Sequence, residues 1–394
     1  MIRFDNLLLV AAVAVVVPLA LGLLPAVKVP AVVFEIIGGV VVGPAVLGWV
    51  HLDTAVQVVS DLGLGYLLFL AGYEIDLRLL NRQSLDVAGR AFVVSAGLAL
   101  GVAYMLQAGG LVKDGLLVGI TLLSTSLGIL VPILKDAGQS GTGFGRLIMT
   151  AASFAELVPL VLLSLFFSAQ ASNSGTELAF LGLFIVCALL GLMAIRRVRN
   201  WTALRIVVVR LEESSSQLRV RLSIILPLAF AVLAQHFGLA TILGAFVAGL
   251  ILRSLQDAHG EDLGIRSKLE AIGFGFLIPI FFVSTGVGLD VTALFHSSRA
   301  ITDVPLFLAA LLIARGLPAV LYTNQFGRTR AVAAGFMQAT NLIFIVVATE
   351  IGVATGHQRP STAAALVVAG VLSVIIYPAL ALKFLRRETA EGRP

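Results

Sequence analysis

Apolar residues recur along this chain in runs of about 17 to 25 positions, separated by short polar stretches. An α-helix rises about 1.5 Å per residue, so each run is long enough to cross about 30 Å of hydrocarbon. Outer-membrane barrels instead alternate polar and apolar positions in segments of about ten residues, and no such alternation runs through this sequence. The pattern predicts an all-α polytopic membrane protein.

The runs predict thirteen spans, and an odd number places the two termini on opposite sides of the membrane. The predicted spans cover residues 5–24, 30–49, 57–75, 87–107, 112–134, 146–168, 178–196, 220–238, 240–254, 270–290, 302–323, 329–351 and 361–383. Of the 27 Lys and Arg residues, 22 lie in alternate connections that include the C-terminus, four lie in the other connections, and Arg315 lies within a span. Because cytoplasmic loops carry the basic excess, we expect a bacterial inner (plasma) membrane protein with its C-terminus cytoplasmic and its N-terminus outside.

Composition narrows the class further. The chain is 59% hydrophobic and 12% charged, with a mean hydropathy of +1.03, which leaves too little polar surface to coat a water-soluble globule. Its isoelectric point near 9.7 would suit a nucleic-acid-binding protein, but the uneven distribution of the basic residues assigns them to membrane topology. We therefore expect the lipid bilayer, and no nucleic acid, as a partner.

Two glycine-containing segments recur in the same order in both halves of the chain. Residues 37–43 (IGGVVVG) match residues 243–249 (LGAFVAG) at an offset of 206, and residues 70–76 (LAGYEID) match residues 284–290 (STGVGLD) at an offset of 214. Small residues that permit close helix packing would explain either match alone, but not their shared order. Since seven spans separate the equivalents, the sequence predicts two repeats of opposite orientation, an arrangement typical of secondary transporters.

The repeats define the expected domain organisation. Residues 1–176 would form the first inverted repeat, residues 177–219 a connecting span with a basic cytoplasmic linker, and residues 220–394 the second inverted repeat.

Two predicted spans carry polar clusters at matching positions. Ser124, Thr125 and Ser126 interrupt the fifth span, and Gln338, Thr340 and Asn341 interrupt the twelfth, with Thr125 and Thr340 at an offset of 215. Polar clusters in the middle of a membrane span are places where a helix can unwind and free carbonyl groups for ion coordination. The sequence thus predicts two discontinuous helices. Ser and Thr bonding within an intact helix is the alternative.

Two ionisable residues lie well inside predicted spans. Glu156 is in the sixth span and Arg315 is in the eleventh, and each is costly in hydrocarbon unless it is neutral, paired or functional. We expect Arg315 to be the ion-pair partner of Glu156. A salt bridge that only fixes the two helices is the alternative to a transport role.

At this point the chain resembles the monovalent cation:proton antiporter family, in the branch of bacterial sodium/proton antiporters and potassium-efflux antiporters. The segments that carry the resemblance are residues 29–48, 62–72, 125–126, 244–249 and 281–284. The resemblance implies a homodimer of thirteen-helix protomers with crossed, discontinuous helices. Each protomer would have a core domain from spans 4–6 and 11–13 and a dimerisation domain from spans 1–3 and 8–10.

The resemblance also implies a site in span six. The family carries an Asp pair there, or Asn or Gln followed by Asp, and these positions correspond to Ala155 and Glu156 in this sequence. The family's basic residue in span eleven corresponds to Arg315. The residues expected to bind the monovalent cation or the proton are Glu156, Thr125, Ser126, Ser153 and Asn341.

These features together predict exchange of a monovalent cation, Na⁺ or K⁺, for a proton by alternating access. Arginine stays protonated in proteins, so one carboxylate would carry either ligand and the exchange would be electroneutral. An exporter or symporter of an organic anion, held by Arg315, and a non-transporting membrane sensor are the alternatives. No cofactor is expected, and no phosphate loop or nucleophile elbow suggests an enzyme.

Overall fold

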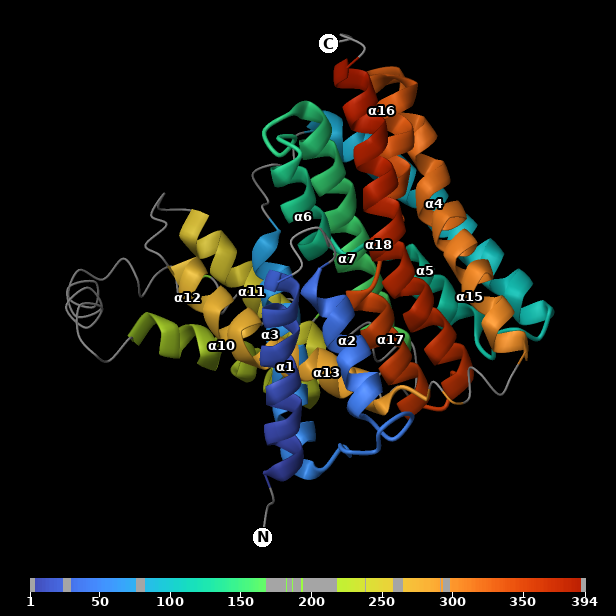
Figure 1. Ribbon diagram of the computed structural model, residues 1–394. Coiled ribbons are helices and arrows are strands. Elements are labelled where there is room, and N and C mark those ends of the chain that lie inside the picture. The colour runs from blue at the N-terminus through green and yellow to red at the C-terminus, as the bar shows by residue number, and fades with distance from the viewer. Residues whose placement is uncertain are drawn as a thin grey trace, which may run out of the picture. The chain divides into compact units, whose positions relative to one another are not determined.

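The computed structural model describes residues 4–23, 30–75, 82–167, 218–237, 239–257, 265–290 and 298–390, together with residues 182, 186, 193 and 292. Every regular element within these ranges is a helix (Figure 1). The prediction of an all-α membrane protein is therefore confirmed. The predicted connecting span at 178–196 and nearly all of the segment 177–219 lie outside the described residues, so the number of thirteen spans stays a prediction.

Most of the described elements are α-helices, and the others are short π-helical or 3₁₀ turns. Their bounds are α1 (Asp5–Leu23), α2 (Ala31–Val42), α3 (Thr54–Glu74), α4 (Arg82–Ala108), α5 (Gly115–Leu123), α6 (Leu127–Asp136), α7 (Gly143–Phe167), α10 (Leu218–His236), α11 (Thr241–Asp257), α12 (Ile265–Ile272), η2 (Gly273–Leu277), α13 (Ile278–Gly288), α15 (Ser298–Leu311), η3 (Leu312–Gly316), η4 (Leu317–Tyr322), α16 (Thr323–Gln338), α17 (Ile343–Ala354) and α18 (Pro360–Ala390). The elements η2 and η3 are π-helical turns, and η4 is a 3₁₀ turn.

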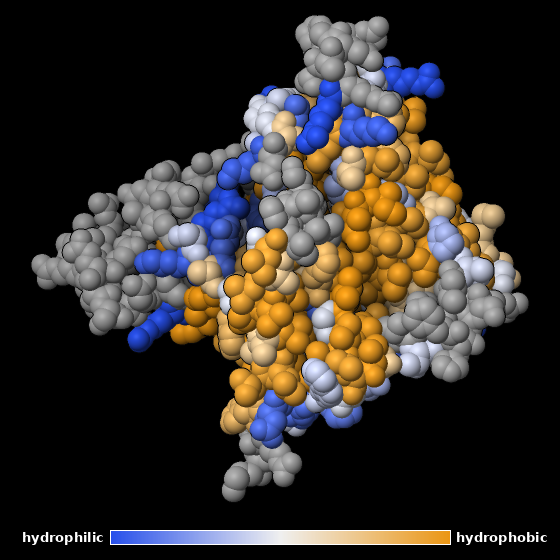
Figure 2. Space-filling model, viewed as in Figure 1, coloured by the Kyte–Doolittle hydropathy of each residue, from blue (hydrophilic) through white to orange (hydrophobic). Residues whose placement is uncertain are grey.

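Eight helical stretches among the described residues are long and apolar enough to cross a membrane. One of them, Thr302–Ala354, contains Gly327 in the left-handed region at φ 78°, so the chain turns there between two spans. The surface along α18 is dominated by apolar residues, whereas hydrophilic residues gather near its C-terminal end (Figure 2). This division fits a helix whose sides face lipid and whose end reaches water.

The second predicted span is shorter in the structure than in the sequence. Helix α2 ends at Val42, where Gly43 leaves helical geometry, and Gly48 then adopts φ 64°. The backbone N–H groups of Trp49 and Val50 both donate to Val42 O at 3.0 Å, so the chain folds back on the end of the helix. The prediction of a helix through residue 49 was wrong, because Gly43, Pro44 and Gly48 allow a turn inside an apolar run.

The chain forms two compact units. The first contains Met1–Ala14, Asp53–Leu77 and Ser164–Ser284, and the second contains Val15–Leu52, Arg78–Leu163 and Thr285–Pro394. The second unit holds the spans that we expected in a core domain, and it holds α2 as well. The division into core and dimerisation domains stays a prediction.

In the first unit, α3 and α11 touch through their backbones. A Cβ atom at Gly72 would lie 2.1 Å from Phe246 O, and one at Gly249 would lie 1.9 Å from Phe69 O. No side chain other than hydrogen fits at either position, because real Cβ atoms do not approach other atoms so closely. These two glycines therefore allow the backbones of α3 and α11 to come into contact.

In the second unit, α2 makes the corresponding contact with the C-terminal end of α13. A Cβ atom at Gly286 would lie 2.1 Å from Ile36 O, and one at Gly43 would lie 3.0 Å from Val287 Cα. Gly43 and Gly249 differ by the predicted offset of 206, and Gly72 and Gly286 differ by the predicted offset of 214. The two close contacts thus use equivalent glycines of the two proposed repeats.

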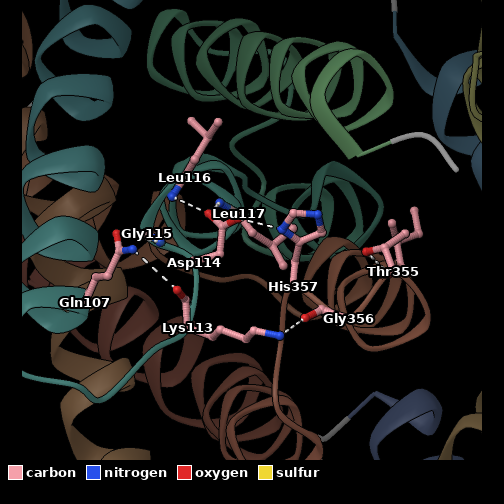
Figure 3. A network of polar contacts seen from close by, with 10 residues as sticks. Gln107, Lys113, Asp114, Gly115, Leu116, Leu117, Thr355, Gly356 and His357 are labelled. Atoms are coloured by element: carbon pink, nitrogen blue, oxygen red, sulfur yellow. Dashed lines mark hydrogen bonds and ion pairs between the residues drawn. The ribbon is translucent and has the colours of Figure 1, made fainter. Parts of the chain in front are cut away.

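The turn before α5 is tied to the turn between α17 and α18 (Figure 3). Asp114 caps α5 by accepting two backbone N–H bonds through Oδ1, and its Oδ2 lies 2.8 Å from Nδ1 of His357. Lys113 Nζ donates to the carbonyl oxygen of Gly356 in the same place. These contacts fix the ends of two helices that also meet at the candidate site.

Candidate functional site

Two helices of the second unit are discontinuous, and their breaks are bonded to each other. Helical geometry stops at Leu123 and resumes at Leu127, and it stops again at Gln338 and resumes at Ile343. Across the breaks, Ser126 N donates to Thr340 O at 3.1 Å, and the hydroxyl of Thr125 donates to Gln338 O at 2.5 Å. The polar clusters seen in the sequence stand at these breaks.

Side chains at each break satisfy the helix ends at the other. Ser126 Oγ accepts from Leu342 N at 3.1 Å and from Ile343 N at 3.3 Å, so it caps the start of α17. Asn341 Nδ2 donates to Thr121 O at 3.1 Å, near the end of α5. Helix ends expose backbone groups that hydrocarbon cannot satisfy, so this exchange of bonds lets both helices end inside the membrane.

Glu156 lies on α7 beside the first break, with 5% of its surface exposed. Pro159 has no N–H group and therefore cannot bond the carbonyl of Ala155, four residues earlier. That carbonyl instead accepts from Thr125 N at 3.2 Å. The proline thus frees a backbone acceptor that fixes the break next to Glu156.

Arg315 lies in the π-helical turn η3 with 4% of its surface exposed. Its Nε donates to Thr125 Oγ1 at 2.9 Å, its Nη1 to Ser95 Oγ at 3.1 Å, and its Nη2 to Gln338 Oε1 at 2.5 Å. The guanidinium carbon also lies 5.9 Å from the ring centre of Phe92. We call Ser95, Thr125 and Gln338 the neutral cradle of Arg315.

Within the described residues, the three side-chain hydrogen bonds of Arg315 go to uncharged oxygen atoms. The ion pair of Arg315 with Glu156 stays a prediction. Opposite charges in neighbouring spans predict a pairing, but they do not specify which acceptors the helices bring within reach. The π-helical turn, which shifts the phase of the helix at Arg315, directs its side chain to the breaks.

The predicted ligands differ in how many lone pairs of the side-chain oxygen remain available to bind a cation. Thr125 Oγ1 accepts from Arg315 and donates to Gln338 O, and Ser126 Oγ accepts from two N–H groups. Ser153 Oγ donates to Met149 O one turn earlier in α7. The Thr125 and Ser126 oxygens accept bonds from protein donors, which makes them weaker candidates for an ion, whereas Ser153 Oγ only donates and keeps its acceptor lone pairs.

Asn341 differs from the other predicted ligands. Its side chain is fully buried, and its Oδ1 accepts no hydrogen bond from the part of the chain that the structure describes. An amide oxygen is a hard donor of the kind that alkali and alkaline-earth cations bind. Asn341 Oδ1 and the Glu156 carboxylate are accordingly the strongest candidates in this unit.

Sequence reasoning missed two serines. Ser95 on α4 belongs to the neutral cradle, and Ser373 Oγ on α18 accepts from Asn341 N at 3.1 Å. A single serine in an apolar helix usually bonds the carbonyl one turn earlier, so the sequence offers no signal for either role. Within the described ranges, no three His, Cys, Asp or Glu side chains gather closely enough to hold a metal ion together.

Comparisons with known proteins agree on one family. The model of the family described as sodium/hydrogen exchanger, transmembrane, matches residues 11–384 of this chain. The chain is 30% identical over 377 residues to YjbQ of Bacillus subtilis strain 168, a putative Na⁺/H⁺ antiporter, across 92% of this chain and 60% of that protein. The chain thus spans less than two thirds of the length of YjbQ.

A second relative matches along most of both sequences. GerN of Bacillus cereus, a Na⁺/H⁺-K⁺ antiporter, is 26% identical over 359 residues, which is 89% of this chain and 88% of that protein. Among solved structures, the sodium proton antiporter MjNhaP1 of Methanocaldococcus jannaschii superposes with a TM-score of 0.70 over 95% of this chain and 97% of that chain. At 17% sequence identity, this likeness shows the fold.

Proposed function

The chain belongs to the transmembrane sodium/hydrogen exchanger family, and from that membership we propose that it exchanges Na⁺ or K⁺ for a proton through a site centred on Glu156. The observation that carries the site is the position of Glu156, buried on α7 beside two helix breaks that are bonded to each other. Asn341 Oδ1 is the second proposed ligand. GerN supports K⁺ as well as Na⁺ as a candidate substrate.

Competition for one carboxylate gives the exchange. Glu156 binds a proton or a cation, each displaces the other, and the site opens in turn to either side of the membrane. Arg315 keeps its charge throughout, because a guanidinium does not lose its proton in proteins. One proton is therefore exchanged for one cation, and the cycle moves no net charge.

The proposal includes the setting of the site. The protein resides in the plasma membrane with its C-terminus cytoplasmic and its N-terminus outside, as the distribution of basic residues supports. It acts as a homodimer, in which a core domain from spans 4–6 and 11–13 moves against a dimerisation domain from spans 1–3 and 8–10. Two inverted repeats supply the two broken helices of the core.

The test is a flux measurement in proteoliposomes that contain a pH-sensitive dye. Addition of Na⁺ or K⁺ is expected to dissipate an imposed proton gradient for the wild type and for Glu350→Gln, whose side chain is exposed on α17, but not for Glu156→Gln. The cation concentration at half-maximal rate is expected to rise as the pH falls. Retained exchange by Glu156→Gln would refute the site.

Electroneutrality has its own measurement in the same vesicles. An imposed membrane potential without a pH gradient is expected to drive no Na⁺ uptake. Uptake that follows the potential would mean that charge moves in each cycle, and the one-carboxylate scheme would then be wrong.

A further inference from the structure

Gln338 is the one residue of the neutral cradle that bonds Arg315 and α7 with the same side chain. Its Oε1 accepts from Arg315 Nη2 at 2.5 Å, and its Nε2 donates to Ile148 O of α7 at 3.1 Å. The side chain is 1% exposed. Its backbone carbonyl accepts the hydroxyl of Thr125, so Gln338 connects the turn that carries Arg315, the helix that carries Glu156 and the first break.

A neutral residue at this place is unusual for a buried arginine. Buried charges in proteins are commonly paired with an opposite charge, because an unpaired charge is strongly disfavoured away from water. Arg315 instead has three uncharged acceptors for its five N–H donors. Hydrogen bonds of this kind hold the guanidinium in position without cancelling its positive charge.

That charge is connected to Glu156 through two intermediate residues, Thr125 and Ala155. Arg315 bonds the side chain of Thr125, and Thr125 N bonds the carbonyl of Ala155, the neighbour of Glu156. A positive charge at such a place weakens the binding of protons and of cations to the carboxylate alike. For any two unit charges about 10 Å apart at an effective dielectric constant of about 20, the effect on either affinity is roughly tenfold.

We propose that Gln338 and Ser95 are positioning residues whose neutrality keeps the charge of Arg315 acting on the ion site. The inference rests on the proposed function, because it assigns the cradle a role in tuning the affinity of Glu156. In this scheme, the amide of Gln338 sets where the guanidinium points and ties it to α7. The lack of a carboxylate in the cradle sets how weakly the site holds its ligands, and so how readily it releases them.

Gln338→Glu and Gln338→Met separate charge from position. Glutamate keeps the acceptor for Arg315 and neutralises the guanidinium through an ion pair, but it loses the bond that Gln338 Nε2 donates to Ile148 O. Methionine has a similar length, removes both amide bonds and leaves the charge. With Gln338→Glu, the cation concentration at half-maximal rate is expected to fall about tenfold at alkaline pH, where protons no longer compete. It is expected to stay unchanged at acid pH, because both affinities rise together. The pH at which protons and cations compete equally should rise by about one unit.

Gln338→Met is expected to behave differently. Arg315 keeps its charge, so the half-maximal cation concentration at alkaline pH should stay within about twofold of the wild type, while the turnover number falls because the guanidinium and α7 lose their link. Equal half-maximal concentrations for Gln338→Glu, Gln338→Met and the wild type at alkaline pH would overturn the proposal. So would an equal fall for both variants.

A binding measurement keeps the inference separate from the proposed function. Thermal unfolding of the purified protein over a series of NaCl concentrations reports cation binding without transport, because a ligand of the native state raises the melting temperature. The Gln338→Glu protein is expected to reach half of the maximal rise at about one tenth of the wild-type concentration at alkaline pH. If this shift occurs and no variant exchanges ions in proteoliposomes, the proposed function fails and the role of the cradle stands.

Ser95 supplies a second pair of variants. Ser95→Asp places a carboxylate at the Nη1 position, and Ser95→Asn is its uncharged control of the same size. The same tenfold fall is expected for Ser95→Asp and not for Ser95→Asn. If the cation concentration at half-maximal rate falls equally for Ser95→Asp and Ser95→Asn, the effect comes from side-chain size and the role of neutrality is refuted. This test does not depend on whether Gln338→Glu folds.

Discussion

The hydroxyl of Thr125 joins the buried charge to the helix breaks, and its removal tests how much the breaks depend on it. Thr125 Oγ1 accepts from Arg315 Nε at 2.9 Å and donates to Gln338 O at 2.5 Å. Thr125→Val preserves the shape of the side chain and removes both bonds. A charged donor and a backbone carbonyl are then left without that partner in a buried site.

The expected loss can be worked out from these two contacts. A hydrogen bond to a charged group contributes about 2 kcal/mol and a neutral one about 1 kcal/mol, so Thr125→Val should lower the free energy of unfolding by about 3 kcal/mol. Thr121→Val is the matched control, since Thr121 is equally buried, and its hydroxyl donates only to Leu117 O at 2.7 Å within α5. That loss should be about 1 kcal/mol.

The assay is unfolding by SDS in mixed micelles, followed by intrinsic fluorescence, for the wild type, both valine variants and Thr125→Ser. Serine keeps the hydroxyl, so Thr125→Ser should recover most of the loss. If Thr125→Val is no less stable than Thr121→Val, the hydroxyl of Thr125 does not hold the breaks together and the description of the site is wrong.

Three further predictions concern other parts of the molecule. Gly249→Ala, whose Cβ would lie 1.9 Å from Phe69 O, should cost about 3 kcal/mol in unfolding free energy, whereas Gly97→Ala in α4, with open space around it, should stabilise by about 0.5 kcal/mol. Asp114→Ala should destabilise by about 1 kcal/mol in the same unfolding assay through loss of the cap of α5, and Asp114→Asn, which keeps a capping oxygen, by only a few tenths. Backbone and side-chain hydrogen bonds lower the pKa of Asp53 at the start of α3, so its stabilisation is present above its unfolded pKa and lost as the pH falls through its folded pKa. The melting temperature of Asp53→Ala should therefore lie below that of the wild type at pH 7, and the difference should shrink below about pH 4; a constant difference would contradict this assignment.

Hydropathy and polar clusters in the sequence indicate much of this fold. The two breaks stand where matched clusters of small polar residues fall inside apolar runs, since hydrocarbon tolerates such residues only where they bond backbone or each other. The extent of α2 could not be predicted in the same way. Apolar residues continue through residue 49, and only Gly43 and Pro44 distinguish a turn from a longer helix.

The partners of the buried charges were harder to predict. Glu156 and Arg315 both look costly in hydrocarbon, and charge alone suggests that they pair. The hydrogen-bond acceptors of Arg315 depend on a π-helical turn and on a serine from α4, neither of which leaves a periodic signal in the sequence. The role of Pro159 could have been found, because its missing N–H necessarily frees the carbonyl of Ala155.

The bonds between the two breaks also bear on how the protein is made. The partners of Thr125 and Ser126 lie 213 and 216 residues later in the chain. During translation, the first broken helix must therefore enter the bilayer before the residues that satisfy its break have been synthesised. We expect that helix to be held continuous, or sheltered by the insertion machinery, until the C-terminal half arrives, so that the ion site is among the last parts of the molecule to form.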